Sequence, residues 1–262
     1  MKKSSDLVGK VAVVTAAGSG IGRAGAEAIA SSGALVIVCD LVGSRAEETA
    51  RRIHLEGGSA EFQTLDVGDD QSLGDLIAKT ASQHGKIDIL HSHAGVQIEG
   101  GIEDLDADGM DASYKLNLRS HFVAVKNVVP YMKDQGGAIL LTSSNAGVFP
   151  DYGMIGYITT KSAVIMMAEQ LALDLAKYSI RVNALCPGWI DTPFNSAYER
   201  QLGGREALED VVARRVPLGR FGSVGEIADA ILFLVSERSS YITGHALVID
   251  GGERLVGAGP LK

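Results

Sequence analysis

Tyr157 and Lys161 stand four residues apart, at the start of a stretch whose pattern predicts a helix to about Tyr178. Side chains at positions i and i+4 of a helix lie on the same face. A free phenol has a pKa of about 10 and is a poor base near neutrality. An ammonium group beside it favours the phenolate and lowers that pKa. The spacing therefore predicts a proton donor and acceptor that works near pH 7.

Ser144 follows an apolar run at 138–142 that is typical of a strand. A loop of suitable length would bring its hydroxyl beside that of Tyr157, which gives two donors aimed at one substrate oxygen. The Tyr-x-x-x-Lys spacing is a weak signal by itself, because it also occurs in helices where the tyrosine packs and the lysine is solvated. The interpretation therefore depends on the elements that would position these side chains.

Apolar runs typical of strands alternate with helical patterns along the whole chain. We expect strands at 11–15, 34–39, 60–65, 87–91, 138–142, 180–186 and 246–249, and helices at 22–32, 45–56, 71–84, 111–133, about 157–178 and 224–236. This alternation predicts an α/β protein, in which a parallel sheet of about seven strands carries helices on both faces in a doubly wound Rossmann fold. We expect a single domain over residues 1–262, with residues 189–217 forming a lid over the site.

Composition limits the classes of function. The chain has 262 residues, 46% apolar and 21% charged, and a formal charge of −8 without a basic stripe, so we expect neither nucleic acid nor an anionic membrane as a partner. No apolar run reaches the roughly 18 residues of a membrane span, and the first residues lack the apolar core of a secretory signal. Cys39 and Cys186 end apolar strands, which indicates reduced core thiols of a cytoplasmic protein.

A glycine-rich turn, 16–22, joins the first expected strand to the first expected helix. Glycines at 18, 20 and 22 would let backbone N–H groups approach a pyrophosphate at a helix N-terminus, although a plain tight turn has the same composition. Asp40 favours the first interpretation, since it follows the second strand where an acid would accept bonds from an adenosine ribose diol. The same carboxylate would repel a 2′-phosphate, so we expect NAD, with NADP less favoured. Asp66 is a candidate for the adenine, with a loop-capping role as the alternative.

Over roughly residues 6–252 the chain resembles the short-chain dehydrogenases/reductases. The motifs that carry the resemblance are the glycine turn, Asp66-Val67, Ser92-His93-Ala94-Gly95, Asn117, the set Ser144, Tyr157 and Lys161, Pro187-Gly188, and Asp250-Gly251-Gly252. The resemblance implies an oxidoreductase that moves a hydride between the nicotinamide of NAD and a secondary alcohol or ketone, with Tyr157 as the acid and base. It also implies that Lys161 holds the nicotinamide ribose and that Asn117 holds a water linking Lys161 to solvent. The alternative for Asn117 is a polar residue that bridges a helix irregularity, and the two roles are compatible.

The expected site follows from the motifs and the resemblance together. The catalytic residues are Asn117, Ser144, Tyr157 and Lys161. The cofactor-binding residues are Gly18, Ser19, Gly20, Ile21, Gly22, Asp40, Leu41, Asp66, Val67, His93, Ala94, Gly95, Tyr157, Lys161, Pro187, Gly188, Ile190 and Thr192. The substrate-pocket residues are Ser144, Asn145, Phe149, Tyr152, Tyr157, Trp189 and Phe194.

Two positions depart from the family pattern. Ala16 stands where the family has its first glycine, so alanine adds strain if the backbone there needs a positive φ. His93 stands where the family has an asparagine that ties backbone segments together, and an imidazole can replace that tie in part. His91 and His93 alternate along a strand, but no third ligand has a matching spacing, so we expect no metal site.

The substrate is an alcohol or ketone whose identity the sequence leaves open. The alternatives are a 3-oxoacyl-carrier-protein reductase, which would use NADPH, and a non-catalytic NAD-sensing protein on the same fold. Apolar side chains on several faces of the two long helices predict a homotetramer; the set is Val123, Val128, Met166, Met167, Leu171 and Leu175. The competing interpretation is that these side chains all belong to the core of one chain.

Overall fold

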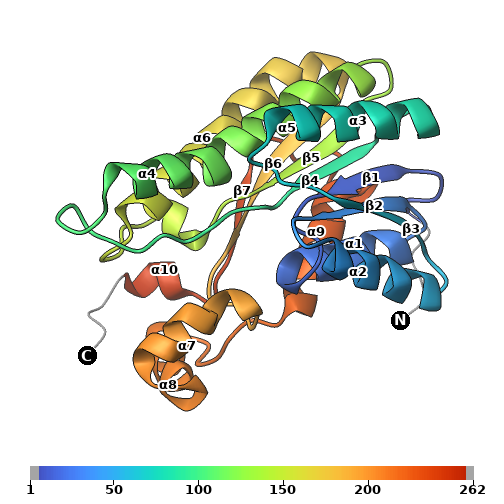
Figure 1. Ribbon diagram of the computed structural model, residues 1–262. Coiled ribbons are helices and arrows are strands. Elements are labelled where there is room, and N and C mark those ends of the chain that lie inside the picture. The colour runs from blue at the N-terminus through green and yellow to red at the C-terminus, as the bar shows by residue number, and fades with distance from the viewer. Residues whose placement is uncertain (1–5, 258–262) are drawn as a thin grey trace.

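The computed structural model describes residues 6–257 and contains one sheet of seven strands in the order β3-β2-β1-β4-β5-β6-β7 (Figure 1). All neighbouring strands are parallel. The strands are β1 (Val11–Val14), β2 (Leu35–Asp40), β3 (Ser59–Thr64), β4 (Ile89–Ser92), β5 (Gly137–Thr142), β6 (Ile180–Pro187) and β7 (Ala246–Ile249). The expected doubly wound α/β fold is confirmed. Its strand order reverses between β1 and β4, which is where such folds bind ligands.

Helices cover both faces of the sheet. In Figure 1, α3, α5 and α6 lie above it and α1, α2 and α9 lie below. The helices are α1 (Gly20–Ser31), α2 (Gly43–Leu55), α3 (Asp70–His84), α4 (Ala107–Tyr114), α5 (Ser120–Val128), α6 (Ile155–Leu175), α7 (Ser196–Leu202), α8 (Arg205–Arg215), α9 (Val224–Val235) and α10 (Glu253–Val256).

The two faces of the sheet build two separate cores. Val13 and Ile37 are partners on β1 and β2 and pack under α3, α5 and α6, whereas the next partners, Val14 and Val38, pack against α1 and α9. This alternation follows from the two-residue repeat of a strand. Because both faces are buried, the inner strands are mostly apolar, and each fully buried Val or Ile contributes about 1.5–3 kcal/mol. The edge strand β3 is the exception, since it is largely polar and exposed.

The prediction of one regular helix at 111–133 is wrong in two respects, the residue at which the helix begins and its regularity. It begins earlier, at Ala107, because the Asp106 side chain accepts a hydrogen bond from the Gly109 N–H at 2.8 Å and caps the first turn. It is then interrupted by a π-helical segment, Lys115–Arg119, before α5 continues to Val128. Such insertions are rare and often mark functional positions, and this one contains Asn117.

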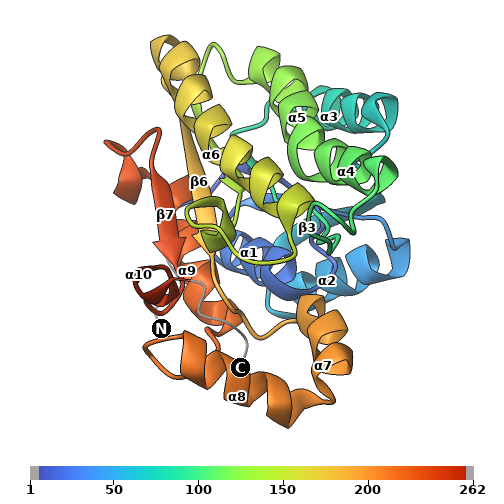
Figure 2. The same cartoon turned by 90° about the vertical axis from the view of Figure 1, so that its left-hand side faces the viewer.

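The segment expected as a lid, 189–217, is mostly helical. Alongside a short 3₁₀ turn, Pro193–Asn195, it contains α7 and α8, which lie below the sheet in both views (Figures 1 and 2). Its buried side chains form a small core of their own, made by Leu208, Val212 and Val216 with Trp189 and Tyr198 against them. The segment is therefore a packed helical unit rather than a loose loop.

Three of the six side chains expected at a subunit contact belong to the core of this chain. Val123, Val128 and Leu175 are 7%, 0% and 7% exposed, because they face the sheet. Met166 is 63% exposed and stays available for a contact.

Cys39 and Cys186 are free and buried, and burial raises the pKa of their thiols to about 12 and about 11. Within residues 6–257, no helix combines the length and the apolar character needed to cross a membrane.

Candidate active site

The expected catalytic and cofactor residues meet in one cavity of about 360 Å³ at the carboxyl ends of the strands. This volume is within the usual range for a small-molecule site. The expected residues that line it are Ser19, Gly20, Ile21, Asp40, His93, Gly95, Ser144, Tyr157, Lys161, Pro187, Gly188, Ile190 and Thr192. The expected residues Gly18, Gly22, Leu41, Asp66, Val67, Ala94 and the catalytic candidate Asn117 do not line it. Phe194, expected in the substrate pocket, does line it, and so do Arg45, Thr142, Ser143 and Asn195, which the sequence motifs do not predict.

The glycine turn has the shape of a cradle for a phosphate group. A Cβ at Gly22 would lie 2.1 Å from the Ala16 carbonyl oxygen, and a Cβ at Gly18 would lie 2.6 Å from Asp40 Oδ2, so neither position tolerates a side chain. Helix α1 begins at Gly20, and Ser19 does not cap it with its side chain. Its first backbone N–H groups and its dipole are therefore free to bind an anion in the cavity. The residues present fit a dinucleotide pyrophosphate.

Ala16 has a φ of +51°, in the left-handed region. The backbone at this position therefore does need a positive φ, as the sequence analysis considered. The alanine carries strain that the glycine of the family pattern would avoid. Among the described residues other than glycine, only Ser179 shares a positive φ. The strain is consistent with a turn whose path is fixed by the close approach of Gly22.

Asp40 is held rigidly at the end of β2. Its Oδ2 accepts from the Gly18 N–H and its Oδ1 from the Val42 N–H, each at 2.9 Å. Arg45, a cationic residue, lines the same cavity. Asp66 lies outside the cavity and accepts from the Gly68 N–H at 2.8 Å, as the loop-capping alternative requires.

His93 ties the ends of three strands together. Its backbone N–H donates to Thr15 Oγ1 at 2.9 Å, and its Nδ1 lies 3.0 Å from Thr142 Oγ1, which also contacts His91 Nε2 at 3.0 Å. These bonds join β1, β4 and β5, which supports the expectation that the imidazole replaces the asparagine of the family pattern in this tie. Burial holds the pKa of both imidazoles far below the ordinary value, so the rings are neutral.

Asn117 and Lys161 approach each other around Gly95. A Cβ at Gly95 would lie 2.9 Å from Asn117 Oδ1 and 3.1 Å from Lys161 Nζ. Asn117 accepts from the Val96 N–H at 2.7 Å and donates to Thr160 Oγ1 at 3.3 Å. The π-helical segment thus turns a fully buried amide toward Lys161, and the two roles expected for Asn117, holding a water and bridging the helix irregularity, stay predictions.

Lys161 and Tyr157 are both deeply buried on α6. Lys161 donates to the Thr142 carbonyl at 2.9 Å, and burial lowers the pKa of its ammonium to about 8. Its Nζ lies 5.7 Å from the centre of the Tyr157 ring. Burial raises the pKa of Tyr157, and a hydrogen bond with Ser144 opposes that rise only in part. The expectation that Lys161 lowers this pKa is therefore wrong, because desolvation of the phenol dominates.

Ser144 and Asn145 connect the site around Tyr157 to Glu253 by hydrogen bonds. The Ser144 hydroxyl donates to Asn145 Oδ1 at 3.3 Å and accepts from the Ala146 N–H at 3.1 Å. The Asn145 amide donates to Glu253 Oε2 at 2.6 Å. A carboxylate accepts only from the NH₂ end of an amide, so Glu253 fixes the amide with its oxygen toward Ser144.

A second cavity opens over Ser144 and Tyr157. Of the expected substrate residues, Ser144, Asn145, Phe149, Tyr157, Trp189 and Phe194 line it. Tyr152 does not; it is 79% exposed and lines an adjoining cavity. The cavity is also lined by Gln97, Asp151, Met154, Tyr198 and Glu253. The sequence does not predict these residues, since none belongs to a family motif and their elements lie far apart in the chain.

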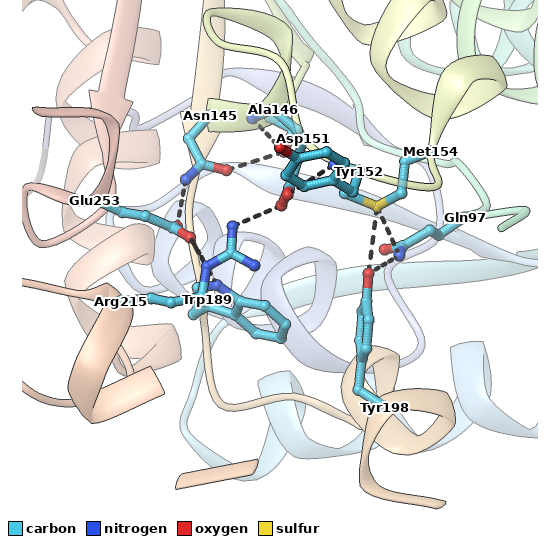
Figure 3. Close-up of polar contacts among 11 residues, drawn as sticks. Gln97, Asn145, Ala146, Asp151, Tyr152, Met154, Trp189, Tyr198, Arg215 and Glu253 are labelled. Carbon is cyan, nitrogen blue, oxygen red and sulfur yellow. Dashed lines mark hydrogen bonds and ion pairs between the residues drawn. The ribbon is translucent and has the colours of Figure 1, made fainter. Parts of the chain in front are cut away.

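Tyr198 of α7 connects the helical segment 193–215, where a lid is expected, to the body of the protein. Its hydroxyl accepts from Gln97 Nε2 and lies 3.2 Å from Met154 Sδ (Figure 3). Its ring meets Trp189 edge to face, with centroids 5.1 Å apart. Trp189 is therefore both a wall of the cavity and part of the small core of the lid.

The histidines do not form a metal site. Over residues 6–257 there is no group of three or more His, Cys, Asp or Glu side chains placed to hold a metal ion. His91 and His93 instead share a threonine hydroxyl.

Comparisons with known proteins agree with this geometry. A family model described as Enoyl-(Acyl carrier protein) reductase matches residues 15–253. The chain is 35% identical to 3-oxoacyl-[acyl-carrier-protein] reductase of Thermotoga maritima, covering 94% of this chain and 98% of the relative, and 35% identical to trans-4-hydroxycyclohexanecarboxylate dehydrogenase of Sinomonas cyclohexanicum, covering 97% and 96%. It also resembles the crystal structure of a gluconate 5-dehydrogenase from Burkholderia cenocepacia in complex with NADP and tartrate, with a TM-score of 0.88, 31% identity and coverage of 96% and 97%.

Proposed function

Because this chain belongs to the short-chain dehydrogenase/reductase family and is an oxidoreductase acting on CH–OH groups, we propose that it transfers a hydride between NAD and a secondary alcohol or its ketone. Ser144 and Tyr157 line both the cofactor cavity and the substrate cavity. This shared position of two hydroxyls carries the proposal, because the reacting oxygen must meet both of them where the two cavities join.

Each residue has a role that follows from its surroundings. Tyr157 takes the proton from the alcohol or gives it to the ketone oxygen, and Ser144 turns its hydroxyl from Asn145 to that same oxygen. Lys161 is anchored to the Thr142 carbonyl and supplies the nearby positive charge. Asn117 fixes the backbone at Val96 beside it.

The cofactor would be held by groups already in place. The glycine turn would bind the pyrophosphate, Asp40 the adenosine ribose diol, and Lys161 the nicotinamide ribose, with Ile190 and Thr192 beside the carboxamide. When bound, the nicotinamide supplies or accepts the hydride. Asp40 supports NAD, while the NADP named with the related gluconate dehydrogenase and the nearby Arg45 keep NADP as the second candidate.

The resemblance to an acyl-carrier-protein reductase of Thermotoga maritima supports one alternative activity, reduction of a 3-oxoacyl thioester with NADPH. A non-catalytic NAD sensor is the other. Absorbance at 340 nm distinguishes the three, with NAD or NADP and a panel of secondary alcohols in one direction and a 3-oxoacyl thioester in the other. Tight NAD binding without turnover would favour the sensor.

Replacing Tyr157 by phenylalanine tests the proposed mechanism. Tyr157→Phe keeps the ring but removes the oxygen, so we expect kcat to fall by roughly 10²-fold or more while the NAD dissociation constant changes little. Tyr178→Phe is the matched control, since that ring lies outside the cavity beside Lys133 and Lys177. A Tyr157→Phe variant that turns over near the wild-type rate would remove the basis of the proposal.

A further inference from the structure

A buried cluster of charges forms the far wall of the substrate cavity. Arg215 at the end of α8 lies 2.6 Å from Asp151 Oδ2 through its Nη2, and 3.3 Å from Glu253 Oε1 through its Nε. The three side chains are 9%, 13% and 3% exposed. Figure 3 shows that they come together from α8, from the loop before α6 and from the start of α10.

Burial raises the pKa of Glu253, whereas Arg215 and the hydrogen bonds from Asn145 and Trp189 act in the opposite direction and favour its carboxylate form. Its Oε2 accepts from the Asn145 amide at 2.6 Å and its Oε1 from the Trp189 indole N–H at 2.9 Å. Both partners are donors at these atoms, so both oxygens act as acceptors, as in a carboxylate. With Asp151 also facing Arg215, the cluster holds two negative charges against one positive charge.

Nothing else in these cavities balances the surplus negative charge. Asp151 and Glu253 line the cavity over Ser144 and Tyr157, while Asp151 and Arg215 line the adjoining one, whose rim adds Glu99 and Asp104. Among the described residues that line these two cavities, Arg215 is the one cationic side chain, and two carboxylates already engage it. An anionic group on the substrate would therefore meet uncompensated negative charge.

The other walls are neutral. Phe149, Met154 and Trp189 offer apolar surface, and Gln97 and Tyr198 offer neutral polar groups. The oxygens of Asp151 have further lone pairs beyond those used by Arg215 and by the Tyr152 N–H. A hydroxyl can donate to such an oxygen and accept from a guanidinium at once, which a carboxylate or a phosphate cannot.

We propose that the substrate is an uncharged alcohol with a second hydroxyl at its far end, bound by the Asp151–Arg215–Glu253 cluster, and that this cluster excludes anionic substrates. The inference rests on the proposed function, because it names the substrate class of the same site. It separates this chain from enzymes whose substrates end in a carboxylate or a phosphate.

Three ligands with the same ring and the same reacting hydroxyl test the proposal. trans-Cyclohexane-1,4-diol carries the far hydroxyl, cyclohexanol lacks it, and trans-4-hydroxycyclohexanecarboxylate replaces it with an anion. Their dissociation constants are measured by calorimetry at pH 7.5 on the NAD-saturated Tyr157→Phe variant, which keeps the ring and is not expected to oxidise the ligands during the titration. The variants below are made in the same background. We expect the diol to bind most tightly and the acid at least about tenfold more weakly than the diol. An acid that binds as well as the diol, a cyclohexanol that binds as well as the diol, or no measurable binding of the diol would each overturn the proposal.

A charge-removing variant shows whether the cluster is responsible. Asp151→Asn should lower the ratio of the dissociation constant of the acid to that of the diol at least about threefold. Asp229→Asn removes one charge from the exposed face of α9 and should leave this ratio of dissociation constants unchanged. Equal effects of the two variants would contradict a role for the cluster, and circular dichroism checks that both are folded. Because binding is read separately from absorbance at 340 nm, loss of the proposed activity and loss of this selectivity are distinguishable outcomes.

Discussion

At the scale of single residues, burial decides the chemistry of Tyr157 and Lys161. Desolvation opposes the charged form of each, so it raises the pKa of the phenol and lowers that of the ammonium. The spacing of the two residues predicts that they act together, but their depth below the surface belongs to the fold and could not be seen in the sequence. The pair therefore needs a further positive charge or donor nearby before the phenolate forms near neutrality.

Lys161→Met should stabilise the protein without cofactor. The folded pKa of about 8 lies below the ordinary value of 10.5, so the unfolded chain binds more protons between these values. Wild-type stability thus rises with pH through that window, and below pH 8 the full penalty of the buried ammonium is present. After subtracting the hydrogen bond lost at the Thr142 carbonyl, we expect a gain of roughly 2 kcal/mol at pH 7 that fades toward pH 10.5.

Urea unfolding at pH 7, 8.5 and 10 measures this gain. Lys79→Met, at an exposed position of α3, is the control and should change stability little at any of these pH values. A Lys161→Met gain that does not depend on pH would show that packing, not the buried charge, explains it.

Asp40 is a second residue-scale test. Because both of its oxygens are fixed by backbone N–H groups, the carboxylate cannot swing away from a 2′-phosphate. We expect NAD to bind at least about tenfold more tightly than NADP, and Asp40→Ala to narrow this ratio, since Arg45 then faces the phosphate unopposed. Fluorescence titration of both cofactors gives the ratio. Asp66→Ala should leave it unchanged, and equal affinities in the wild type would contradict the role of Asp40.

At the scale of elements, hydrophobic pattern predicts most strands and helices to within one or two residues, because a parallel sheet buried on both faces makes its strands continuously apolar. The same pattern cannot show where a helix changes its hydrogen bonding. The π-helical segment at Lys115–Arg119 has no distinctive composition, and it contains the fully buried Asn117. The sequence also did not predict the helices α7 and α8 in the segment 189–217. Their core has only three buried apolar side chains, too few for a clear helical pattern.

The turn between β1 and α1 offers a test at this scale. Ala16 has a positive φ, which costs an alanine about 1–2 kcal/mol. A glycine avoids that strain but lowers stability by about 0.4–1 kcal/mol, because it increases the conformational entropy of the unfolded chain. Ala16→Gly should therefore stabilise the protein by roughly 0.5–1 kcal/mol. Thermal unfolding measures the change. Ala17→Gly, at the next residue without a positive φ, should instead lower stability, and a loss in both variants would mean that Ala16 is not strained.

At the scale of the whole molecule, the site is assembled from both ends of the chain. The family motifs predict the cofactor side, because most of them follow strands whose carboxyl ends reach the same edge of the sheet. The Asp151–Arg215–Glu253 cluster could not be predicted, since it joins a loop, the lid and α10 across about one hundred residues of sequence. Substrate choice therefore depends on contacts that only the folded chain creates.

The last prediction concerns assembly. Large apolar side chains stay exposed on α5 and α6, which lie side by side in both views (Figures 1 and 2): Phe122 is 50% exposed, Met166 63% and Leu173 76%. Burying such a surface would be favourable, and a two-fold contact does so on both copies at once. We expect a homotetramer with this pair of helices at one interface. Light scattering should give four times the 27.4 kDa of one chain. Phe122→Glu with Met166→Glu should lower that mass, whereas Leu55→Glu, at an exposed position of α2, should not. A wild-type monomer at micromolar concentration would contradict the prediction.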